Sequence, residues 1–305
     1  RTRVSFSVPA LVDLLWRSQP ELVFSNLSHL NLILAMTRFL MPRTIKFIAR
    51  ESSVVSINMK QYRAQSLWRF LYNFFYHRLD MVICQTAIMQ NDIVTNFSVP
   101  IEKTVIIQNP VDVENIRIMA KEGMANVIAQ PSATRFRFVF VGGLRPEKRV
   151  DRLLRAFALI PPDEAGLDIV GDGPERQILH QLCDDLGLAA RTRFVGFQAN
   201  PYGWIKAADA LLLTSDYEGA PNVVLEALAL GTPVISTPAS GGVREILLGQ
   251  PGCVIANAST SESFAKAVNC WLNLRDKVTS EQAVEGHSVA RITRQYEDQF
   301  LGLLS

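Results

Sequence analysis

Two glutamates around a strand-to-helix turn are the residues whose types and spacing most readily suggest chemistry. Glu218 lies in the turn DYEGAPN at residues 216–222, and Glu226 follows about two helical turns later. Backbone N–H groups at the start of the predicted helix form a natural site for anions and hydroxyls. We therefore expect both carboxylates to face one cleft.

A basic loop precedes these glutamates in the sequence. Lys148 follows a predicted strand at residues 136–141 and the glycine pair Gly142 and Gly143, and Arg145 lies in the same loop. A fixed cation in this position would stabilise negative charge on a departing group. The alternative is that Arg145 and Lys148 belong to an ordinary solvated loop.

Two further turns follow predicted strands. Gly171, Asp172 and Gly173 form the turn GDGP, whose glycines allow a backbone to approach a ligand closely, although an ordinary strand-to-helix turn has the same composition. Phe197 lies in the turn GFQ and could pack beside a flat ring, whereas an isolated aromatic residue more often belongs to the core.

Short apolar runs alternate with helical patterns along the whole chain, which predicts βαβ units with parallel sheets. The pattern weakens at residues 113–132, so we place a boundary there, between a first domain at residues 1–125 and a second at residues 126–305. We expect the final helix to pack back on the first domain. Such sheets place ligands at the carboxyl ends of their strands. Strands are predicted at 21–25, 45–49, 81–84, 104–108, 136–141, 167–170, 193–195, 210–214 and 233–236, and helices at 9–16, 31–40, 65–78, 87–96, 150–159, 175–186, 202–207, 222–230 and from 261 onward.

Composition excludes several classes of function. The 305 residues are 48% hydrophobic with a net charge of +2, so no overall charge draws the chain to nucleic acid. The stretch at residues 30–41 is too short and too interrupted to span a membrane. Cys84, Cys183, Cys253 and Cys270 show no metal-ligand spacing, and we expect buried thiols in a reducing, cytoplasmic compartment.

The longest motif run carries a family resemblance. The segments EGAPNVVLEALALGTPVIST and GGVREIL resemble the donor-site signature of the family-4 glycosyltransferases, and NPVD, VGGLRPEK and GDGP match that family's order and spacing. The resemblance implies a GT-B fold of two Rossmann-like domains facing a cleft. It further implies retaining transfer from a nucleotide-diphosphate sugar, which we expect to be uridine-linked, to a glycan or lipid-linked acceptor in polysaccharide or lipopolysaccharide synthesis.

The same resemblance assigns roles at the donor site. It implies that Glu218 contacts the donor sugar and Glu226 the ribose, and that Lys148 neutralises the diphosphate. Gly143 stands where the family has an arginine, and we expect Arg145 to substitute for it. No Asp-x-Asp motif is present in the sequence, so we expect neither a metal nor a cofactor. The backbone amides that the family uses for the sugar and diphosphate would come from near Ala220, Asn222 and Val223. Gly219 and Pro221 would also belong to the donor site, with the base held near Phe197.

The first half carries weaker signals. Where many relatives have a catalytic histidine, this chain has Arg50 and Glu51, so Glu51 is the acceptor-side candidate, with a loop or capping carboxylate as the alternative. His29 is a second candidate, although a lone histidine is more often a surface or core residue. The helix at residues 65–78 mixes aromatic and basic residues, which suits contact with the cytoplasmic membrane surface or a lipid-linked acceptor as well as core packing.

The family's first strand and glycine-rich turn normally precede everything seen here, so we expect an incomplete N-terminal domain, lacking roughly 60–80 residues. Two alternative functions remain, the first of which follows from this expectation and from Gly143. One is a non-catalytic remnant that binds the donor only. The other is a nucleotide-sugar 2-epimerase, which needs acid and base groups around the sugar, with Glu51, His29 and Glu218 as candidates.

Overall fold

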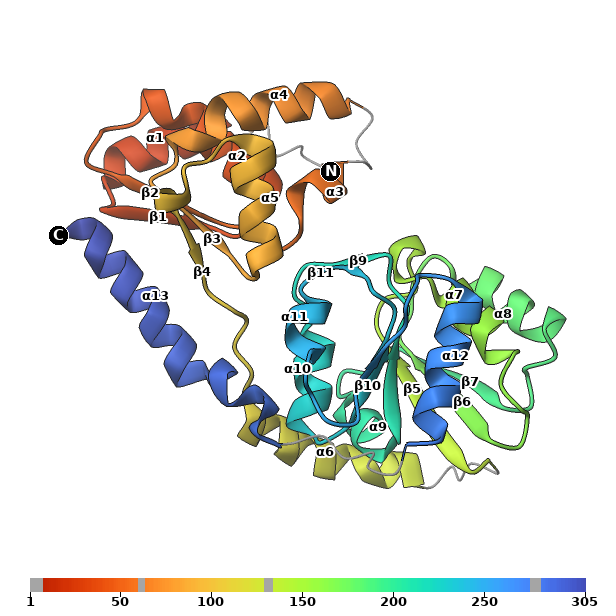
Figure 1. The fold of residues 1–305 in the computed structure, drawn as a ribbon. Helices are drawn as coiled ribbons and strands as arrows, with labels where there is room; N and C mark the ends of the chain where they lie inside the picture. The colour runs from red at the N-terminus through yellow and green to blue at the C-terminus, as the bar shows by residue number, and fades with distance from the viewer. Residues whose placement is uncertain (1–7, 60–63, 129–133, 275–280) are drawn as a thin grey trace. The chain divides into compact units, whose positions relative to one another are not determined.

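The computed structural model describes residues 8–59, 64–128, 134–274 and 281–305, and its chain forms two compact units (Figure 1). Residues 1–109 and 290–305 belong to the first unit and residues 110–289 to the second. Each unit is built on a parallel sheet with helices on its faces, as the alternation of apolar runs and helical patterns predicts.

The first unit contains a four-stranded parallel sheet in the order β1-β2-β3-β4. The strands are β1 (Leu22–Ser25), β2 (Lys46–Arg50), β3 (Met81–Cys84) and β4 (Thr104–Ile106). The helices are α1 (Val8–Ser18), α2 (Ser28–Thr37), α3 (Val55–Asn58), α4 (Gln65–Phe75), α5 (Ala87–Phe97) and α13 (Val289–Leu304), and the short 3-10 turns are η2 (Arg38–Leu40), η4 (Tyr76–Arg78) and η5 (Ile101–Lys103).

Side-chain alternation along β2 divides the core of this unit into two layers. Phe47 and Ala49 pack with α2, α4 and α5, whereas Ile48 packs on the other face with Ile292 of α13. Tyr296 of α13 lies edge-on to Phe24 of β1, with ring centroids 5.9 Å apart. The last helix of the chain therefore completes the core of the first unit.

The second unit contains a six-stranded parallel sheet in the order β12-β10-β8-β5-β6-β7. The strands are β5 (Phe136–Val141), β6 (Ala165–Val170), β7 (Thr192–Gly196), β8 (Ala210–Leu213), β10 (Val234–Ser236) and β12 (Val254–Ile255). The helices are α6 (Val113–Ile128), α7 (Val150–Phe157), α8 (Arg176–Asp185), α9 (Tyr202–Ala207), α10 (Asn222–Ala229), α11 (Val243–Leu247) and α12 (Ser261–Leu272), with the 3-10 segments η6 (Pro146–Lys148) and η7 (Glu281–His287).

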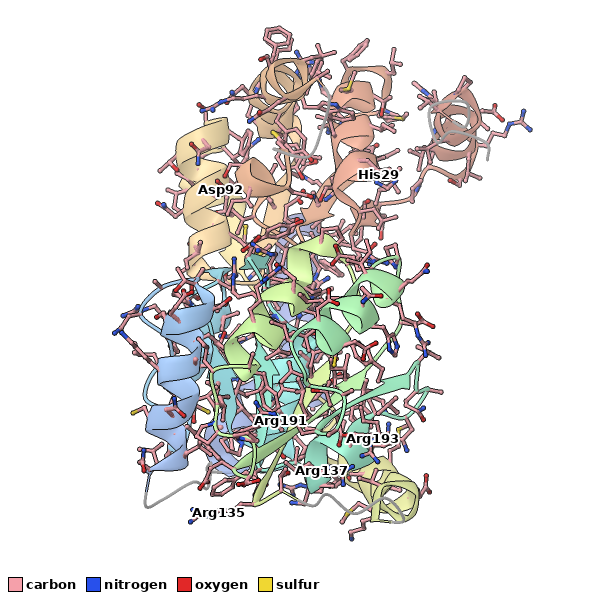
Figure 2. The ribbon with its side chains drawn as sticks, turned by 90° about the vertical axis from the view of Figure 1, so that its right-hand side faces the viewer. His29, Asp92, Arg135, Arg137, Arg191 and Arg193 are labelled. Carbon is pink, nitrogen blue, oxygen red and sulfur yellow. The ribbon has the colours of Figure 1, made fainter. Side chains whose placement is uncertain are left out.

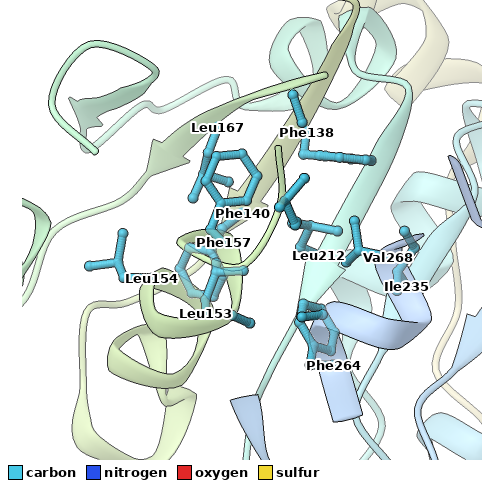
Figure 3. Packing of buried hydrophobic residues seen from close by; sticks show 14 of the residues in the cluster. Phe138, Phe140, Leu153, Leu154, Phe157, Leu167, Leu212, Ile235, Phe264 and Val268 are labelled. Carbon is cyan, nitrogen blue, oxygen red and sulfur yellow. The ribbon is translucent and has the colours of Figure 1, made fainter. Parts of the chain in front are cut away.

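Alternation along β5 again separates two apolar layers. Phe138 and Phe140 pack with Phe157 of α7 and Phe264 of α12, as Figure 3 shows. Val139 faces the opposite layer, which α6, α9, α10 and α11 cover. Because both faces of the sheet are covered, its strands are almost continuously apolar.

Helix α6 corrects the expectation of a weak, irregular stretch at residues 113–132. Residues 113–128 are helical, and residues 129–132 lie outside the described part of the chain. The buried side of this helix is a narrow stripe formed by Ile116, Ala120 and Val127. Because polar residues surround the stripe, the periodic pattern of apolar residues that indicates a helix is weak in the sequence. The helix packs on α9 at a glycine pair, where a Cβ on Gly203 would lie 2.4 Å from the carbonyl carbon of Gly123.

The cysteines are all free, but only two of them match the expectation of buried thiols. Cys84 and Cys183 are buried, Cys253 is partly buried and Cys270 is exposed. No helix in the described part of the chain is both long enough and apolar enough to cross a bilayer.

The glycine contact between α6 and α9 yields a stability prediction. Gly203→Ala should lower the free energy of unfolding of the second unit by about 1–3 kcal/mol, because the added methyl group meets the backbone of α6. Gly302→Ala on α13, where a Cβ meets nothing within 4 Å, should be neutral or slightly stabilising. Urea unfolding of both variants measures the difference, and equal stabilities would contradict the close packing of α6 on α9.

Candidate functional site

An ion pair joins the two residues that the sequence singles out most strongly in the second unit. The Lys148 ammonium donates to Glu218 Oε1 across 2.7 Å, and the Ser215 hydroxyl donates to the same oxygen across 2.6 Å. The side chains of Lys148 and Glu218 are 26% and 10% exposed. The pair is thus partly shielded from water and still accessible to a ligand.

Hydrogen bonds between two loops hold this pair in place. Lys148 ends η6, which follows β5, and Glu218 lies on β9 (Tyr217–Glu218), which follows β8. The Thr214 hydroxyl donates to the carbonyl oxygens of Lys148 and Arg149. The buried Arg152 guanidinium donates to Thr214 O across 2.9 Å and to the Asp216 carboxylate across 2.5 Å. The positions of the cation and the carboxylate are therefore set together.

Glycines at residues 241 and 242 fix Glu218 from the other side. Strand β11 (Ser240–Gly241) pairs in parallel with β9, and the Gly242 N–H donates to Gly219 O across 2.8 Å. Gly241 has φ +119°, and a Cβ there would lie 1.5 Å from Glu218 O. Only glycine fits at this position, which gives the GGVREI motif a structural reason.

The start of α10 lies directly after Glu218. Pro221 is buried at the N-cap, Asn222 is exposed at the first helical position and Val223 is half-buried. Gly219 and Ala220 connect β9 to this helix start and are also half-buried. The N-terminus of an eight-residue helix presents amide groups and a positive dipole end, which favour an anion.

The glycines of the GDGP turn are explained by contact between two loops. A Cβ on Gly171, which has φ +143°, would lie 1.9 Å from Gly142 O, and a Cβ on Gly173 would lie 2.3 Å from Leu144 O. The Leu144 N–H donates to Asp172 O across 3.0 Å. The neighbouring loop thus makes the close backbone approach that these glycines permit.

Arg145 lies beside the position where the family has an arginine. A side chain at Gly143 would begin 3.6 Å from Arg145 Nε and 3.8 Å from its Cγ. The backbone of Arg145 is held by its N–H to Gly143 O and by the Lys148 N–H to Arg145 O. The exposed Arg145 side chain therefore lies next to the space that an arginine side chain at position 143 would fill.

Phe197 is exposed rather than part of the core, with 75% of its surface accessible. It follows Gly196, where a Cβ would lie 3.6 Å from the Arg176 guanidinium. A shallow cavity of about 460 Å³ adjoins this turn and is lined by Asp172, Gly173, Pro174, Arg176, Gln177 and His180.

Glu226 lies in a different pocket, of about 190 Å³. Burial raises the pKa of Glu226, and a hydrogen bond from the Tyr202 hydroxyl opposes that rise. Burial and the Glu226 charge raise the pKa of Tyr202. The pocket is lined by Pro110, Val111, Asp112, Asn115, Ile116, Tyr202, Asn222, Leu225 and Glu226. Sequence reasoning missed Tyr202, which no motif marks, and the pocket-lining role of the NPVD segment.

Glu51 is placed where sequence reasoning did not expect it. Its side chain is 0% exposed inside the first unit, and its carboxylate accepts hydrogen bonds from Ser28 at 2.7 Å, from Asn31 at 2.9 Å and from the Tyr76 hydroxyl. Burial raises the pKa of Glu51, and these hydrogen bonds oppose the rise. The Glu51 carboxylate is thus enclosed by side chains of the first unit, which differs from the alternative of a loop or capping carboxylate, and its acceptor-side role stays a prediction.

Arg50 and His29 are also in the first unit. The Arg50 guanidinium donates to Asn109 Oδ1 across 2.6 Å and to the amide oxygen of the buried Gln85. His29 is exposed near the start of α2, where Figure 2 marks it. Arg50 therefore fixes Asn109, where the first segment of the first unit ends. His29 is a surface residue.

Replacing Glu51 by glutamine tests the buried assignment. Because the folded-state pKa of Glu51 is raised, the folded protein binds this proton more tightly, so stability falls as pH rises through that pKa. Glu51→Gln should remove this pH dependence, which begins above the ordinary carboxyl range at about pH 4 and upward, and keep the fold. Thermal unfolding across that range measures the effect, and an unchanged pH dependence would contradict the assignment.

Comparison with known proteins agrees with the fold. The family model "Glycosyl transferases group 1" matches residues 125–285, and "Glycosyltransferase Family 4" matches residues 2–115. An uncharacterised glycosyltransferase of Methanocaldococcus jannaschii is 30% identical over 238 residues, covering 75% of this chain and 58% of the relative. A second relative is the N-acetylgalactosamine-N,N'-diacetylbacillosaminyl-diphospho-undecaprenol 4-alpha-N-acetylgalactosaminyltransferase of Campylobacter jejuni. It is 30% identical over 228 residues, covering 74% of this chain and 59% of the relative.

This chain thus spans somewhat under 60% of the length of these two curated relatives. Among solved structures, Anabaena HepE in complex with UDP has a TM-score of 0.80 at 21% identity, covering 97% of this chain and 82% of HepE. That likeness, with a parallel sheet in each unit, identifies the two-domain GT-B fold. Since the group 1 model alone matches more than half of the chain, this protein belongs to the group 1 and family 4 glycosyltransferases.

Proposed function

We propose that this chain transfers a sugar from a uridine-diphosphate sugar to a glycan or lipid-linked acceptor, with retention, in polysaccharide or lipopolysaccharide synthesis. The observation that carries the proposal is the Lys148–Glu218 ion pair beside the start of α10, within the family's donor-site sequence. The names of the similar proteins support the ligand classes: HepE was solved with UDP, and the Campylobacter relative acts on a diphospho-undecaprenol-linked sugar.

The ion pair suggests how the donor is held. When the diphosphate arrives, Lys148 exchanges the Glu218 carboxylate for the phosphate oxygens, and Glu218 then accepts hydrogen bonds from donor sugar hydroxyls. Arg145 adds a second cation beside Gly143. Both cations sit on a backbone that is fixed before the ligand binds, so only their side chains need to move to stabilise charge on the departing diphosphate.

The remaining parts of the sugar donor are assigned to neighbouring residues. The N–H groups of Gly219, Ala220, Asn222 and Val223, at the start of α10, bind the sugar and the diphosphate. Glu226 binds the ribose, and the base lies near Phe197 and the adjoining GDGP turn. The acceptor hydroxyl attacks the sugar on the face from which the diphosphate departs and passes its proton to that leaving group. No covalent enzyme intermediate is needed.

Loss of the Lys148 charge provides the first test. Lys148→Ala should weaken binding of UDP by about 10- to 100-fold, because charge-assisted bonds contribute about 1.5–3 kcal/mol. Wild-type protein with UDP at about 100 times its dissociation constant should gain roughly 2.7 kcal/mol of stability. A thermal-shift titration with UDP, GDP and their sugars reads both effects and identifies the preferred base.

Lys266→Ala is the matched control, since Lys266 is an exposed lysine on α12. Equal UDP affinity in the Lys148→Ala and Lys266→Ala proteins would contradict the donor site. Binding without transfer to any supplied acceptor would favour the donor-binding remnant. Formation of an epimer from the donor sugar alone would favour the epimerase.

Helix α4 supports the lipid-linked class of acceptor. Leu67, Phe70 and Phe74 are 55%, 59% and 50% exposed and recur at helical spacing on one face. The rings of Phe70 and Phe74 stack with centroids 5.8 Å apart, and the Arg78 guanidinium lies 5.2 Å from the Phe74 ring. An apolar face bordered by basic residues suits the interface of an anionic bilayer. We therefore include contact of α4 with a lipid surface in the proposal.

A double substitution tests this contact. Phe70→Ser with Phe74→Ser should abolish most co-sedimentation with vesicles that contain phosphatidylglycerol, because the variant loses two apolar anchors. Ile178→Ser on α8 is the control, since Ile178 is 68% exposed but lies in the second unit. Equal sedimentation of the two variants with vesicles would contradict lipid contact through α4.

A further inference from the structure

A buried carboxylate joins three elements at the carboxyl end of the first unit's sheet. Glu51 directly follows β2, and its carboxylate accepts hydrogen bonds from the Ser28 hydroxyl across 2.7 Å and from the Asn31 amide across 2.9 Å, both in the first turn of α2. The Tyr76 hydroxyl, from η4 directly after α4, donates to the same carboxylate. Glu51 therefore links the end of β2 to two helices that cover one face of the sheet (Figure 1).

Further hydrogen bonds close a network around the start of α2. The Tyr72 hydroxyl of α4 donates to Ser28 O across 3.1 Å, and the Asn31 amide also donates to Arg50 O across 3.0 Å. The rings of Tyr72 and Tyr76 lie 4.6 Å apart and are 2% and 0% exposed. Because a buried network with satisfied partners is rigid, the first turn of α2 is held in one position.

The loop between β1 and α2 carries exposed side chains at this end of the sheet. Ser25, the last residue of β1, is buried, whereas Asn26, Leu27 and His29 are exposed, and Figure 2 marks His29. Leu27, the N-cap residue of α2, makes no side-chain cap hydrogen bond. Ligands of open α/β sheets bind at the carboxyl ends of the strands, where this loop lies. The bond from Ser28 to Glu51 therefore fixes a surface that is suited to a ligand.

The donor and the acceptor need different surfaces of the chain. In the proposed function, groups of the second unit hold the donor, so contacts with the acceptor fall to the strand ends of the first unit. We propose that Glu51 is a positioning residue, which fixes the start of α2 through Ser28 so that the exposed loop at residues 26–29 binds the acceptor. This inference rests on the proposed function. It assigns Glu51 an effect on acceptor affinity through α2, and not a direct contact with the reacting atoms.

A role in stability alone has a different kinetic effect. A variant that only unfolds more readily contains fewer active molecules, so kcat falls while the KM of each substrate stays the same. Loss of contacts that are equally strong in the ground state and the transition state raises KM and leaves kcat unchanged. The KM of the acceptor therefore distinguishes positioning of the loop from support of the fold.

The test removes the hydroxyl that joins Glu51 to α2. Steady-state kinetics use UDP-glucose or UDP-N-acetylglucosamine as donor and farnesyl-diphosphate-linked N-acetylglucosamine as acceptor. Ser28→Ala should raise the acceptor KM about tenfold and change kcat and the donor KM by less than about twofold, because only the acceptor loop is displaced. Ser28→Thr keeps the hydroxyl and should restore the wild-type KM. Glu51→Gln combined with Ser28→Ala should raise the acceptor KM no further than the larger single effect, since both act through one bond.

Asp80→Asn is the matched control, because it alters a carboxylate at the opposite end of the same sheet. Asp80 Oδ2 accepts the Phe47 N–H across 2.8 Å, near the amino ends of β2 and β3. The acceptor KM of this variant should equal that of the wild-type protein.

Two results would overturn the assignment of Glu51 while UDP binding and sugar transfer by the wild-type protein still support the proposed function. One is an equal rise of the acceptor KM in Asp80→Asn, and the other is an unchanged acceptor KM in Ser28→Ala, with or without a fall in kcat. If the wild-type protein binds neither UDP nor GDP, or transfers no sugar to the acceptor, the proposed function fails and this assignment falls with it.

Discussion

The structure of the candidate site depends on the hydrogen bonds that tie the loop after β5 to the loop after β8. Through them, the Thr214 hydroxyl and the Arg152 guanidinium fix the backbone on both sides of the Lys148–Glu218 pair. A partly buried ion pair is useful only if its geometry is set in advance, because desolvation otherwise cancels the attraction. The buried hydrogen bonds therefore fix the geometry of the pair, and in the proposed function the accessible ends of Lys148 and Glu218 contact the donor.

Backbone contacts at glycine stiffen the same region. Gly171 and Gly173 let the loops after β5 and β6 touch, and Gly241 lets β11 lie against Glu218. In each case a side chain would collide with a neighbouring carbonyl group. The glycine-rich motifs that mark this family's donor site are, in this chain, devices for packing loop on loop. In the proposed function, residues that follow these glycines bind the ligand, and Arg145 and Lys148 are the clearest of them.

The sequence was sufficient to predict the α/β class, the strands Met81–Cys84 and Phe136–Val141 and the helix Tyr202–Ala207, because long apolar runs and clear turns bound each of them. It was insufficient for α6, whose buried stripe is narrow, and for Glu51, because a carboxylate near a strand end is not expected to be fully buried. The network around Glu51 comes from α2 and η4, far away in the sequence. Tyr202 was missed for a similar reason, since its partner lies on α10 and pairing across helices leaves no local pattern.

The most direct measurement of the central claim is a crystal structure of this protein with UDP. The account predicts that the diphosphate lies at the start of α10, that Lys148 Nζ leaves Glu218 for a phosphate oxygen, and that Arg145 lies beside the same group. The Thr214 and Arg152 hydrogen bonds should remain as they are without ligand. UDP bound elsewhere, or bound while Lys148 still pairs with Glu218, would contradict the account.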